Sequence, residues 1–394
     1  MKKLFLTTLL FVLSRVTNAQ DTIASYIDNI AASELKKNHG LALVIGVNVD
    51  GKERIFTYGE TEKGNGQKPN ANSIFEIGQV TQVFTCALFA EMSIRGEINP
   101  DEPIRKFLPV DVPAPVYQEI ICEPVTQTDY VYEKGYSIQE KYTRYVCKPD
   151  RSSKPQPILL CYLSTHSSGL PEKPGNLKKN PGNPYAGYTR ENMYDFLRGY
   201  ALPKPIGYDF HYSDLNMALL GHILELKKGK PYETLLDSML LSKLDMNNTA
   251  KSLTENQAKK MLSGHSAKGK PAGNWTYDIM APSGALHSDM EDMMKLLSIN
   301  ISPGNSELKN VFDYTHNPRI RFTDKKYGTT ETGLGWLIRP LNKGDKKYVS
   351  QEGITGGFSS FVGFVETSRT GVVILSNCAV PVSEIGIKIL QELN

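Results

Sequence analysis

The spacing of apolar residues predicts strands at both ends of the chain and helices between them. Two runs rich in β-branched and aromatic residues flank Asp50-Gly51, a pair favoured in tight turns, so residues 41–59 are predicted to form a β-hairpin. Two segments near the C-terminus, 333–340 and 359–377, predict a second group of strands. Helical spacing recurs at 79–95, 191–197, 214–227, 232–240, 283–298 and 382–393.

This order of elements favours an α+β fold. Strands from both chain ends are expected to share one antiparallel sheet flanked by helices, with a mostly helical lobe inserted between them. We expect the sheet lobe to comprise about 20–78 and 280–394, and the helical lobe about 79–279. Ser288 and Asp289 are candidate N-cap residues for the helix predicted near them.

Residues 1–19 have the pattern of a secretory signal peptide. A short basic start precedes the apolar run 4–13, and small residues follow where a signal peptidase cleaves. No cysteine follows this run and no later segment is apolar enough to span a bilayer, so we expect an exported protein without a membrane anchor, periplasmic or secreted from a bacterium. Removing Lys2, Lys3 and Arg15 leaves 42 of the 45 basic residues against 42 acidic ones. This balance does not predict nucleic acid as a partner.

Residues 108–157 differ from the rest of the chain. They combine prolines, tyrosines and charges with little periodicity, so we expect a surface insertion. It is either a decorated loop or a lid or partner surface, because tyrosine is favoured at interfaces. In an exported protein Cys122 and Cys147 are expected to pair and close this insertion. The other cysteines, Cys86, Cys161 and Cys378, have apolar neighbours and are expected to be buried thiols.

Seven short segments carry a further signal, and they follow one another as FEIGQVTQVFT (75–85), ILLCYLSTHSSGLP (158–171), FHYSDLNMALLGHILE (210–225), LLSKLDMNNT (240–249), SGALHSDMEDMMKLL (283–297), GLGW (333–336) and EGITGGFSSFVGF (352–364). Together they resemble the class C β-lactamase group, which includes low-molecular-weight penicillin-binding proteins, D-alanyl peptidases and related esterases. The resemblance covers nearly all of the chain after the leader and implies a serine β-lactamase fold. A fold does not settle a function, which depends on the residues at the site.

The resemblance implies a Ser-x-x-Lys nucleophile motif where this chain has Gln79 and Gln82. The spacing of three puts both side chains on one helix face, where the family's serine attacks and its lysine takes the proton. A neutral amide is a very poor nucleophile and cannot act as a general base. Among neighbours, Thr81 is expected to point away, Cys86 to lie in the core and Ser73 to precede the helix, so none replaces the lost pair.

The second family motif is kept in part. Tyr212 matches a tyrosine that the resemblance implies in proton relay, and Asp214 stands where the family usually has asparagine. Without a cationic neighbour, Tyr212 is expected to stay protonated and to donate or accept hydrogen bonds. His211 is expected to point out of the pocket because adjacent side chains of an extended segment face opposite ways. We interpret His166 as structural, as the resemblance implies.

The third motif is also altered. Gln351, Glu352 and Gly353 stand where the family has Lys-Thr-Gly or His-x-Gly, so a neutral amide and an acid replace groups that hold a substrate carboxylate. The glycine survives, and with it the shape of the strand. The backbone N–H groups of Gln79 and Ile354 match the oxyanion hole of the family. We therefore expect a binding pocket formed by Gln79, Tyr212, Asp214, Glu352, Gly353 and Ile354.

These replacements change the charge of the pocket. Relative to the Lys-Thr-Gly form, two lysines have become glutamines and a threonine has become glutamate, about three units toward negative. A charge in a partly desolvated pocket contributes several kcal/mol, on the order of 4 for a close pair near the surface. The pocket is expected to disfavour carboxylate ligands and to prefer neutral or cationic groups.

The leading hypothesis is an exported pseudoenzyme whose fold and pocket serve to bind an unknown small molecule or protein. The alternative is a hydrolase of the β-lactamase, D-alanyl peptidase or esterase type with a non-standard mechanism, in which Tyr212 and Glu352 perform general acid/base chemistry. An ordinary serine hydrolase would require a different alignment of the nucleophile, which the FEIG string before Gln79 disfavours. We expect no cofactor, and no Cys/His spacing predicts a metal site.

Overall fold

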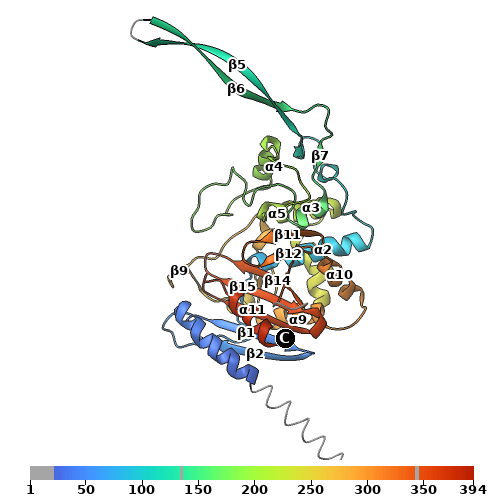
Figure 1. Ribbon diagram of the computed structural model, residues 1–394. Coiled ribbons are helices and arrows are strands. Elements are labelled where there is room, and N and C mark those ends of the chain that lie inside the picture. Colours follow the sequence, from blue (N-terminus) through green and yellow to red (C-terminus); the bar gives the residue numbers. More distant parts are fainter. Residues whose placement is uncertain (1–21, 134–135, 342–345) are drawn as a thin grey trace, which may run out of the picture.

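The computed structural model describes residues 22–133, 136–341 and 346–394. The predicted leader, residues 1–19, lies outside this part of the chain. Figure 1 shows a mixed body with a sheet at its centre, helices around it and one long ribbon standing apart. No helix among the described residues is both long enough and apolar enough to cross a membrane.

The central sheet has eight antiparallel strands in the order β11-β12-β13-β14-β15-β16-β1-β2. The N-terminal strand β1 pairs with the C-terminal strand β16, which confirms that both chain ends share one antiparallel sheet. The strands are β1 (Leu43–Val49), β2 (Lys52–Tyr58), β11 (Ile320–Asp324), β12 (Gly328–Thr332), β13 (Leu337–Pro340), β14 (Lys347–Ile354), β15 (Ser359–Val365) and β16 (Thr370–Ser376).

The predicted N-terminal hairpin is confirmed by the pairing of β1 with β2. Its turn residues Asp50 and Gly51 both have positive φ, 52° and 84°. A two-residue turn with this geometry matches the right-handed twist of the strands, and Asp-Gly reaches it at little cost. The local sequence therefore fixes the register of this hairpin.

Helices cover both faces of the sheet (Figure 1). Residues 22–37 and α11 (Ser383–Glu392) pack on one face, in a cluster of buried apolar side chains that includes Ile45, Phe361 and Ile389. On the other face α9 (Met290–Ile301) lies so close to β1 that a Cβ at Gly46 would meet the Met294 sulfur at 2.5 Å. The larger core lies on this side and continues into the helical region.

The helices of the middle of the chain largely follow the predictions. They are η1 (Gly78–Val80), α2 (Thr81–Ile94), η2 (Ile104–Lys106), α3 (Leu160–Ser164), α4 (Arg190–Gly199), α5 (Asp214–Lys228), α6 (Tyr232–Leu236), η3 (Asp237–Leu241), η4 (Ser242–Leu244), α7 (Glu255–Ala258), α8 (Ala281–Gly284) and α10 (Glu307–His316). The predicted closing helix at 382–393 is α11, and η5 (Glu366–Ser368) joins β15 to β16.

The predicted helix at 283–298 is wrong in its first part. Asp289 accepts a hydrogen bond from the Asp292 N–H and caps α9, which begins only at Met290. Before it, β10 (His287–Ser288) pairs with β3 (Phe75–Glu76). The cap stops the helix from extending backwards, and the preceding backbone finds its partners in a neighbouring strand.

The insertion at 108–157 contains regular structure that its sequence did not predict. Two strands of 14 residues, β5 (Ile120–Glu133) and β6 (Tyr136–Pro149), form a two-stranded ribbon that projects from the body in Figure 1. Cys122 and Cys147 are disulfide-bonded near its base, as predicted. Short pairs, β4 (Val116–Tyr117) with β7 (Gln156–Pro157) and β8 (Gly264–His265) with β9 (Pro271–Ala272), complete the strands.

The three remaining cysteines are free thiols. Cys86 and Cys378 are buried, as predicted. The prediction for Cys161 is wrong in degree, because this residue is only partly buried. Its Sγ donates to the Asp101 carboxylate, a polar partner that the apolar neighbours in the sequence did not indicate.

Candidate functional site

A cleft with a volume of about 690 Å³ lies where η1, the start of α5 and strand β14 meet. Its lining brings together residues that are far apart in the sequence. The residues predicted to form the pocket, Gln79, Tyr212, Asp214, Glu352, Gly353 and Ile354, all line it, together with the motif residue Gln351 and with Glu172, Lys173, Tyr185, Phe210, Trp275, Asp324, Lys326 and Arg339 among others.

Two glycines allow η1 to pack directly against β14. Gly78 has φ +50°, and a Cβ there would lie 2.9 Å from the Ile354 nitrogen. A Cβ at Gly353 would lie 2.1 Å from the Ile77 carbonyl oxygen and 2.9 Å from the Gln79 nitrogen. These neighbours are backbone atoms, which cannot move aside as a flexible side chain can. The close approach sets Gln79 beside the Ile354 N–H.

The Gln79 side chain turns onto this strand. Its Oε1 accepts a hydrogen bond from the Ile354 N–H at 2.7 Å. Ile354 is one of the two backbone donors expected to form an oxyanion hole, so an amide oxygen of the protein itself already occupies one donor. Gln79 remains partly exposed to the cleft.

Gln82 lies one turn further along and is completely buried beneath Tyr212 and Asp214, which line the cleft; we call these three residues the floor. Its Nε2 donates to the Tyr212 hydroxyl at 2.7 Å and also contacts Asp214 Oδ1 at 3.2 Å and the Ser283 carbonyl at 3.3 Å. Its Oε1 faces His166 Nε2 at 3.2 Å. Donor and acceptor sides of the amide are thus both used, which holds it in one orientation.

His166 is buried against Gln82 and is neutral. Its Nδ1 accepts from the Ser213 N–H at 3.1 Å, so its Nε2 carries the proton and donates to the Gln82 oxygen. Burial lowers the His166 pKa to about 3, because the charged imidazolium would lose its hydration there. His166 therefore orients Gln82. His211, expected to point out, is exposed and contacts Lys204.

Asp214 is the only acid in the hydrogen-bonded network around Gln82 that the structure describes. The Tyr185 and Tyr212 hydroxyls each donate to its carboxylate, the latter at 2.5 Å. Burial raises its pKa to about 6, although both tyrosines oppose this shift by stabilising the charged form. Burial and the neighbouring Asp214 charge raise the pKa of Tyr212 well above its usual value. Tyr212 is therefore a protonated hydrogen-bond donor rather than a base.

Gln351 and Glu352, the two residues of β14 that differ from the family motif, project from opposite faces of the strand. Gln351 is buried, and its Nε2 donates to the Gly335 carbonyl at 3.1 Å. Glu352 is the next residue along the strand, so its side chain leaves the opposite face, and it is exposed. It belongs to the outer lining of the cleft and not to the floor, where the acid in the network is Asp214.

The hydroxyls and thiols considered as substitute nucleophiles, and one further serine of the cleft, are each buried or hydrogen-bonded to a partner. Thr81 Oγ1 accepts from the Leu286 N–H inside the core, and Ser73 Oγ accepts from the Asn70 N–H. Cys86 is fully buried against Met217, and burial raises the pKa of its thiol far above its usual value. Ser360, which does line the cleft, donates to the Ile77 carbonyl at 2.7 Å.

Two features of the cleft were not predicted from the sequence: an aromatic wall and three cations. Tyr185 packs against Trp275 with ring centroids 5.8 Å apart, and both line the cleft. The cations Lys173, Lys326 and Arg339 line it as well, and the first two are paired with Glu172 and Glu384. These residues come from loops and strands without a motif, so only their position in space identifies them. The rim is therefore less negative than the three motif positions indicated.

Glu76 supports this wall from behind. It is buried, and its Oε1 accepts from the Trp275 N–H at 2.8 Å. Burial raises the Glu76 pKa to about 7, although a hydrogen bond from Thr355 and the Trp275 N–H favour the charged form. Glu76 thus fixes the backbone of the loop that carries Trp275.

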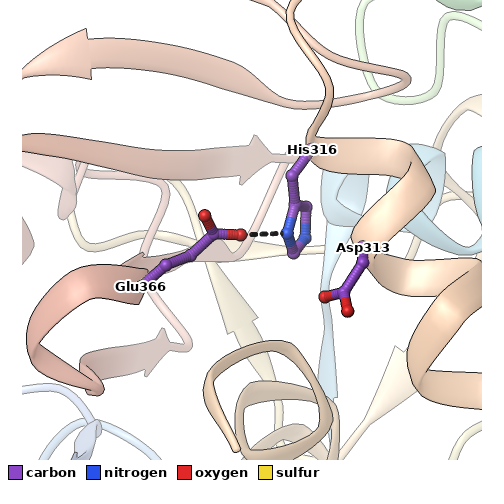
Figure 2. A group of neighbouring side chains, drawn as sticks. All are labelled: Asp313, His316 and Glu366. Carbon is purple, nitrogen blue, oxygen red and sulfur yellow. Dashed lines mark hydrogen bonds and ion pairs between the residues drawn. The ribbon is translucent and has the colours of Figure 1, made fainter. Parts of the chain in front are cut away.

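Figure 2 shows a second cluster, Asp313, His316 and Glu366, whose possible ligand atoms all lie within 4.8 Å of one another. His316 Nδ1 lies 2.5 Å from Glu366, and its Nε2 lies 2.6 Å from Asn300 Oδ1. Lys309 is paired with Asp313. Partners from the chain already occupy these groups, and the hydrogen bond from His316 is the main cause that lowers the Glu366 pKa. We interpret the cluster as a structural network in which the contact of His316 with Glu366 ties α10 to η5.

A family model described as Beta-lactamase matches residues 27–391. The chain belongs to the beta-lactamase family. Among curated relatives, the D-alanyl-D-alanine-carboxypeptidase/endopeptidase AmpH of Escherichia coli (strain K12) is 24% identical over 367 residues, covering 91% of this chain and 83% of that protein. A beta-lactamase of Pseudomonas fluorescens is 23% identical over 398 residues, covering 92% and 95%.

Solved structures agree with the family assignment in fold. A beta-lactamase/D-alanine carboxypeptidase from Pseudomonas syringae has a TM-score of 0.73 at 17% identity and covers 94% of this chain and 98% of that chain. Another, from Yersinia pestis and complexed with citrate, has a TM-score of 0.70 at 22% identity, covering 91% and 95%. The α+β fold expected from the sequence is therefore confirmed.

Proposed function

We propose that this beta-lactamase-family protein binds a ligand or a protein in its cleft and performs no acyl transfer. The observation that carries the proposal is the Gln79 side chain. It supplies no nucleophile, and its Oε1 takes the Ile354 N–H at 2.7 Å. In acyl transfer by a serine enzyme, that donor stabilises the charge that develops on the substrate oxygen. With Gln79 at the nucleophile position the cleft has no nucleophile there, and one of the two backbone donors of the oxyanion hole is already occupied.

Gln82 supports the same proposal from the floor. A general base must release and accept a proton near neutral pH, and a carboxamide does not. Its two ends are engaged by Tyr212 and His166, so the amide is a fixed part of the wall. His166 is held neutral, and its own Nδ1 is occupied by the Ser213 N–H, so it does not take over the role of base.

The geometry gives little support to a hydrolase of another mechanism. Glu352 is exposed and on the far face of β14 from Gln351. Tyr212 holds its proton tightly, and both oxygens of Asp214 accept from tyrosines. A water activated at this floor would need an acceptor that these contacts do not leave open.

The floor of the cleft favours neutral or cationic ligand groups. Asp214 is buried there without a salt-bridge partner among the described residues, although the charge of Lys173 favours its charged form; Lys326 and Arg339 also line the cleft. A ligand carboxylate beside Asp214 would meet a second negative charge in a desolvated site, which is unfavourable. Titration calorimetry with benzylpenicillin tests this point: weak or no binding is expected, and tight binding at this floor would overturn it.

Export to an oxidising compartment is part of the proposal. The bonded pair Cys122–Cys147 supports it, since disulfides persist in periplasmic and secreted proteins, and the sequence of residues 1–19 has the pattern of a leader. Fractionation of a bacterial host that expresses the full chain tests this: recovery of an uncleaved chain in the cytoplasm only would contradict it.

The decisive experiment is the intact mass of the mature protein after separate incubation with benzylpenicillin and with a fluorophosphonate. We expect no adduct on the natural protein and no hydrolysis of a chromogenic cephalosporin. The Gln79→Ser/Gln82→Lys variant is treated in parallel, with Gln79→Ser alone as its matched control. An adduct on the double variant alone would show in addition that the backbone donors keep the geometry that acyl transfer requires.

Two results would overturn the proposal. A stoichiometric adduct on the natural protein would reveal a working nucleophile, which peptide mapping would then identify. Turnover of the cephalosporin without an adduct, lost in Tyr212→Phe or Asp214→Asn, would instead establish a hydrolase without a covalent step. A catalytically active class C enzyme serves as the positive control for both reagents.

A further inference from the structure

The ribbon formed by β5 and β6 exposes much of its apolar surface. Among the large apolar side chains that are exposed, Tyr145 (70%) and Ile120 (58%) lie on it, as do Ile121, Val125, Tyr142 and Val146. β5 and β6 pair only with each other in the part of the chain that the structure describes. A two-stranded ribbon without a core is marginally stable in water, so this one is well suited to acquire a third strand.

The disulfide shows which backbone groups face outward. The Cα atoms of Cys122 and Cys147 are 4.0 Å apart, which is typical of a non-hydrogen-bonded pair in an antiparallel ladder. In such pairs the N–H and C=O groups point away from the partner strand. The pattern repeats every two residues, so Thr126 on β5 and Thr143 on β6, which lie opposite each other, both direct these groups outward.

The two outer edges of the ribbon are not equivalent. Pro124 lies on β5 opposite Tyr145, at a position whose N–H would point outward, and proline has none. This interrupts the row of donors along β5, as proline does at protected sheet edges. On β6 no proline occurs between 137 and 148, so its outward row of donors is continuous. The pairing edge of the ribbon is therefore β6.

Charge along the ribbon favours a copy of the chain as the partner. The half near the body, 120–128 with 141–149, holds Lys141, Arg144 and Lys148 against Glu123. By sequence the outer half, 129–140, holds three acids and one lysine, so the two halves carry opposite net charges of equal size. Two ribbons aligned antiparallel place each basic half along an acidic half, which is the complementarity that steers and orients association.

We infer that two copies of this protein pair through β6, antiparallel, to form the four-stranded sheet β5-β6-β6-β5. Residues of one β6 whose backbone N–H groups face outward must lie opposite such residues of the other β6. The register centred on Tyr142 meets this requirement. It sets Tyr142 opposite the partner's Tyr142, and residue 140, a glutamate, opposite the partner's Arg144. Registers centred on Lys141 or Arg144 would place like charges opposite each other, which is unfavourable.

This surface is independent of the cleft and of the function proposed for it. The ribbon projects from the body, so antiparallel ribbons carry the two bodies at opposite ends (Figure 1). The symmetric pair is isologous, with the same strand used by each copy, and it closes both open β6 edges at once. Closing them leaves only the β5 edges, which Pro124 interrupts.

Sedimentation of the mature protein, on the order of 10 µM, tests the inference with a matched pair of variants. Thr143→Pro removes an outward donor from β6, and Thr126→Pro makes the same change on β5. We expect twice the monomer mass for the natural protein and for Thr126→Pro, and a dissociation constant raised at least about tenfold for Thr143→Pro. A monomeric natural protein, or equal effects of the two variants, would overturn the inference.

Cross-linking tests the register. Under mild oxidation Tyr142→Cys should give a covalent dimer on non-reducing gels, whereas Thr126→Cys and the natural protein, with the same native thiols, should not. Equal cross-linking of both variants would contradict pairing through β6. Thermal unfolding of all variants is measured alongside, and an unchanged main transition shows that the body is folded in each.

Discussion

The floor of the cleft and the β5–β6 ribbon are stabilised by different means. At the floor the backbone is fixed by close packing, with Gly353 against the Ile77 carbonyl, and Gln82 uses both ends of its amide inside the core. The described side chains of the ribbon are nearly all exposed, and its strands are joined by their ladder, one disulfide and the ion pair of Lys148 with Glu123. A substitution at the floor therefore changes the side chain but not the tightly packed backbone around it. The ribbon instead offers backbone edges and exposed side chains to a partner.

The largest expected effect tests how tightly η1 packs on β14. Gly353→Ala would introduce a Cβ 2.1 Å from a backbone oxygen, so η1 or β14 must shift, and we expect a loss of about 3 kcal/mol or more in the free energy of unfolding. Urea denaturation measures it. Gly273→Ala is the control, because nothing lies within 4 Å of a Cβ there. Similar losses in both variants would show that the packing of η1 on β14 is not tight.

The second prediction concerns the ribbon. Cys122 and Cys147 are 25 residues apart, so replacing both by serine releases a closed loop worth about 3 kcal/mol in the chain-entropy model. We expect this loss to act on the ribbon alone. Hydrogen exchange should accelerate in residues 120–149, while the main urea transition stays within about 0.5 kcal/mol. A large fall in the main transition would contradict a ribbon that is independent of the core.

The third prediction uses the Asp214 pKa of about 6. The folded protein holds this proton more tightly than the unfolded chain, so the carboxyl makes folding less favourable as pH rises from about 4 to 6, by roughly 2–3 kcal/mol. Asp214→Asn removes that titration. The unfolding free energy of the variant minus that of the natural protein should therefore increase between pH 4 and 7 and level off above. A difference that is constant with pH would contradict the raised pKa.

The smallest expected effect compares the two glutamines. Gln82→Met would leave the buried His166 Nε2–H without its acceptor and would remove the hydrogen bonds that Gln82 donates to Tyr212 and Asp214, at a cost of about 2 kcal/mol. Gln79→Met removes one hydrogen bond from a partly exposed side chain and should cost less than about 1 kcal/mol. Denaturation at pH 7 separates them. Equal losses would mean that Gln82 is not part of the fixed floor.

The sequence by itself determined most of the fold. The Asp50-Gly51 turn, the helical spacing of α2 and α5 and the paired cysteines were all predictable because each depends on neighbours along the chain or on a strong pattern. The family's motif positions also indicated Gln79 and Tyr212 as cleft residues. Local patterns and motif spacing suffice where the interacting groups lie on one element or in a known order.

Only the tertiary structure decided how those residues are used. The hydrogen bond from Ile354 to Gln79, the second tyrosine on Asp214 and the exposure of Glu352 depend on which segments meet in space. The strands of the ribbon were likewise hidden, because their side chains, as far as the structure describes them, are nearly all exposed and show no alternation with buried ones. Periodicity reports burial against a core, and contacts between distant segments leave no periodic trace in either segment.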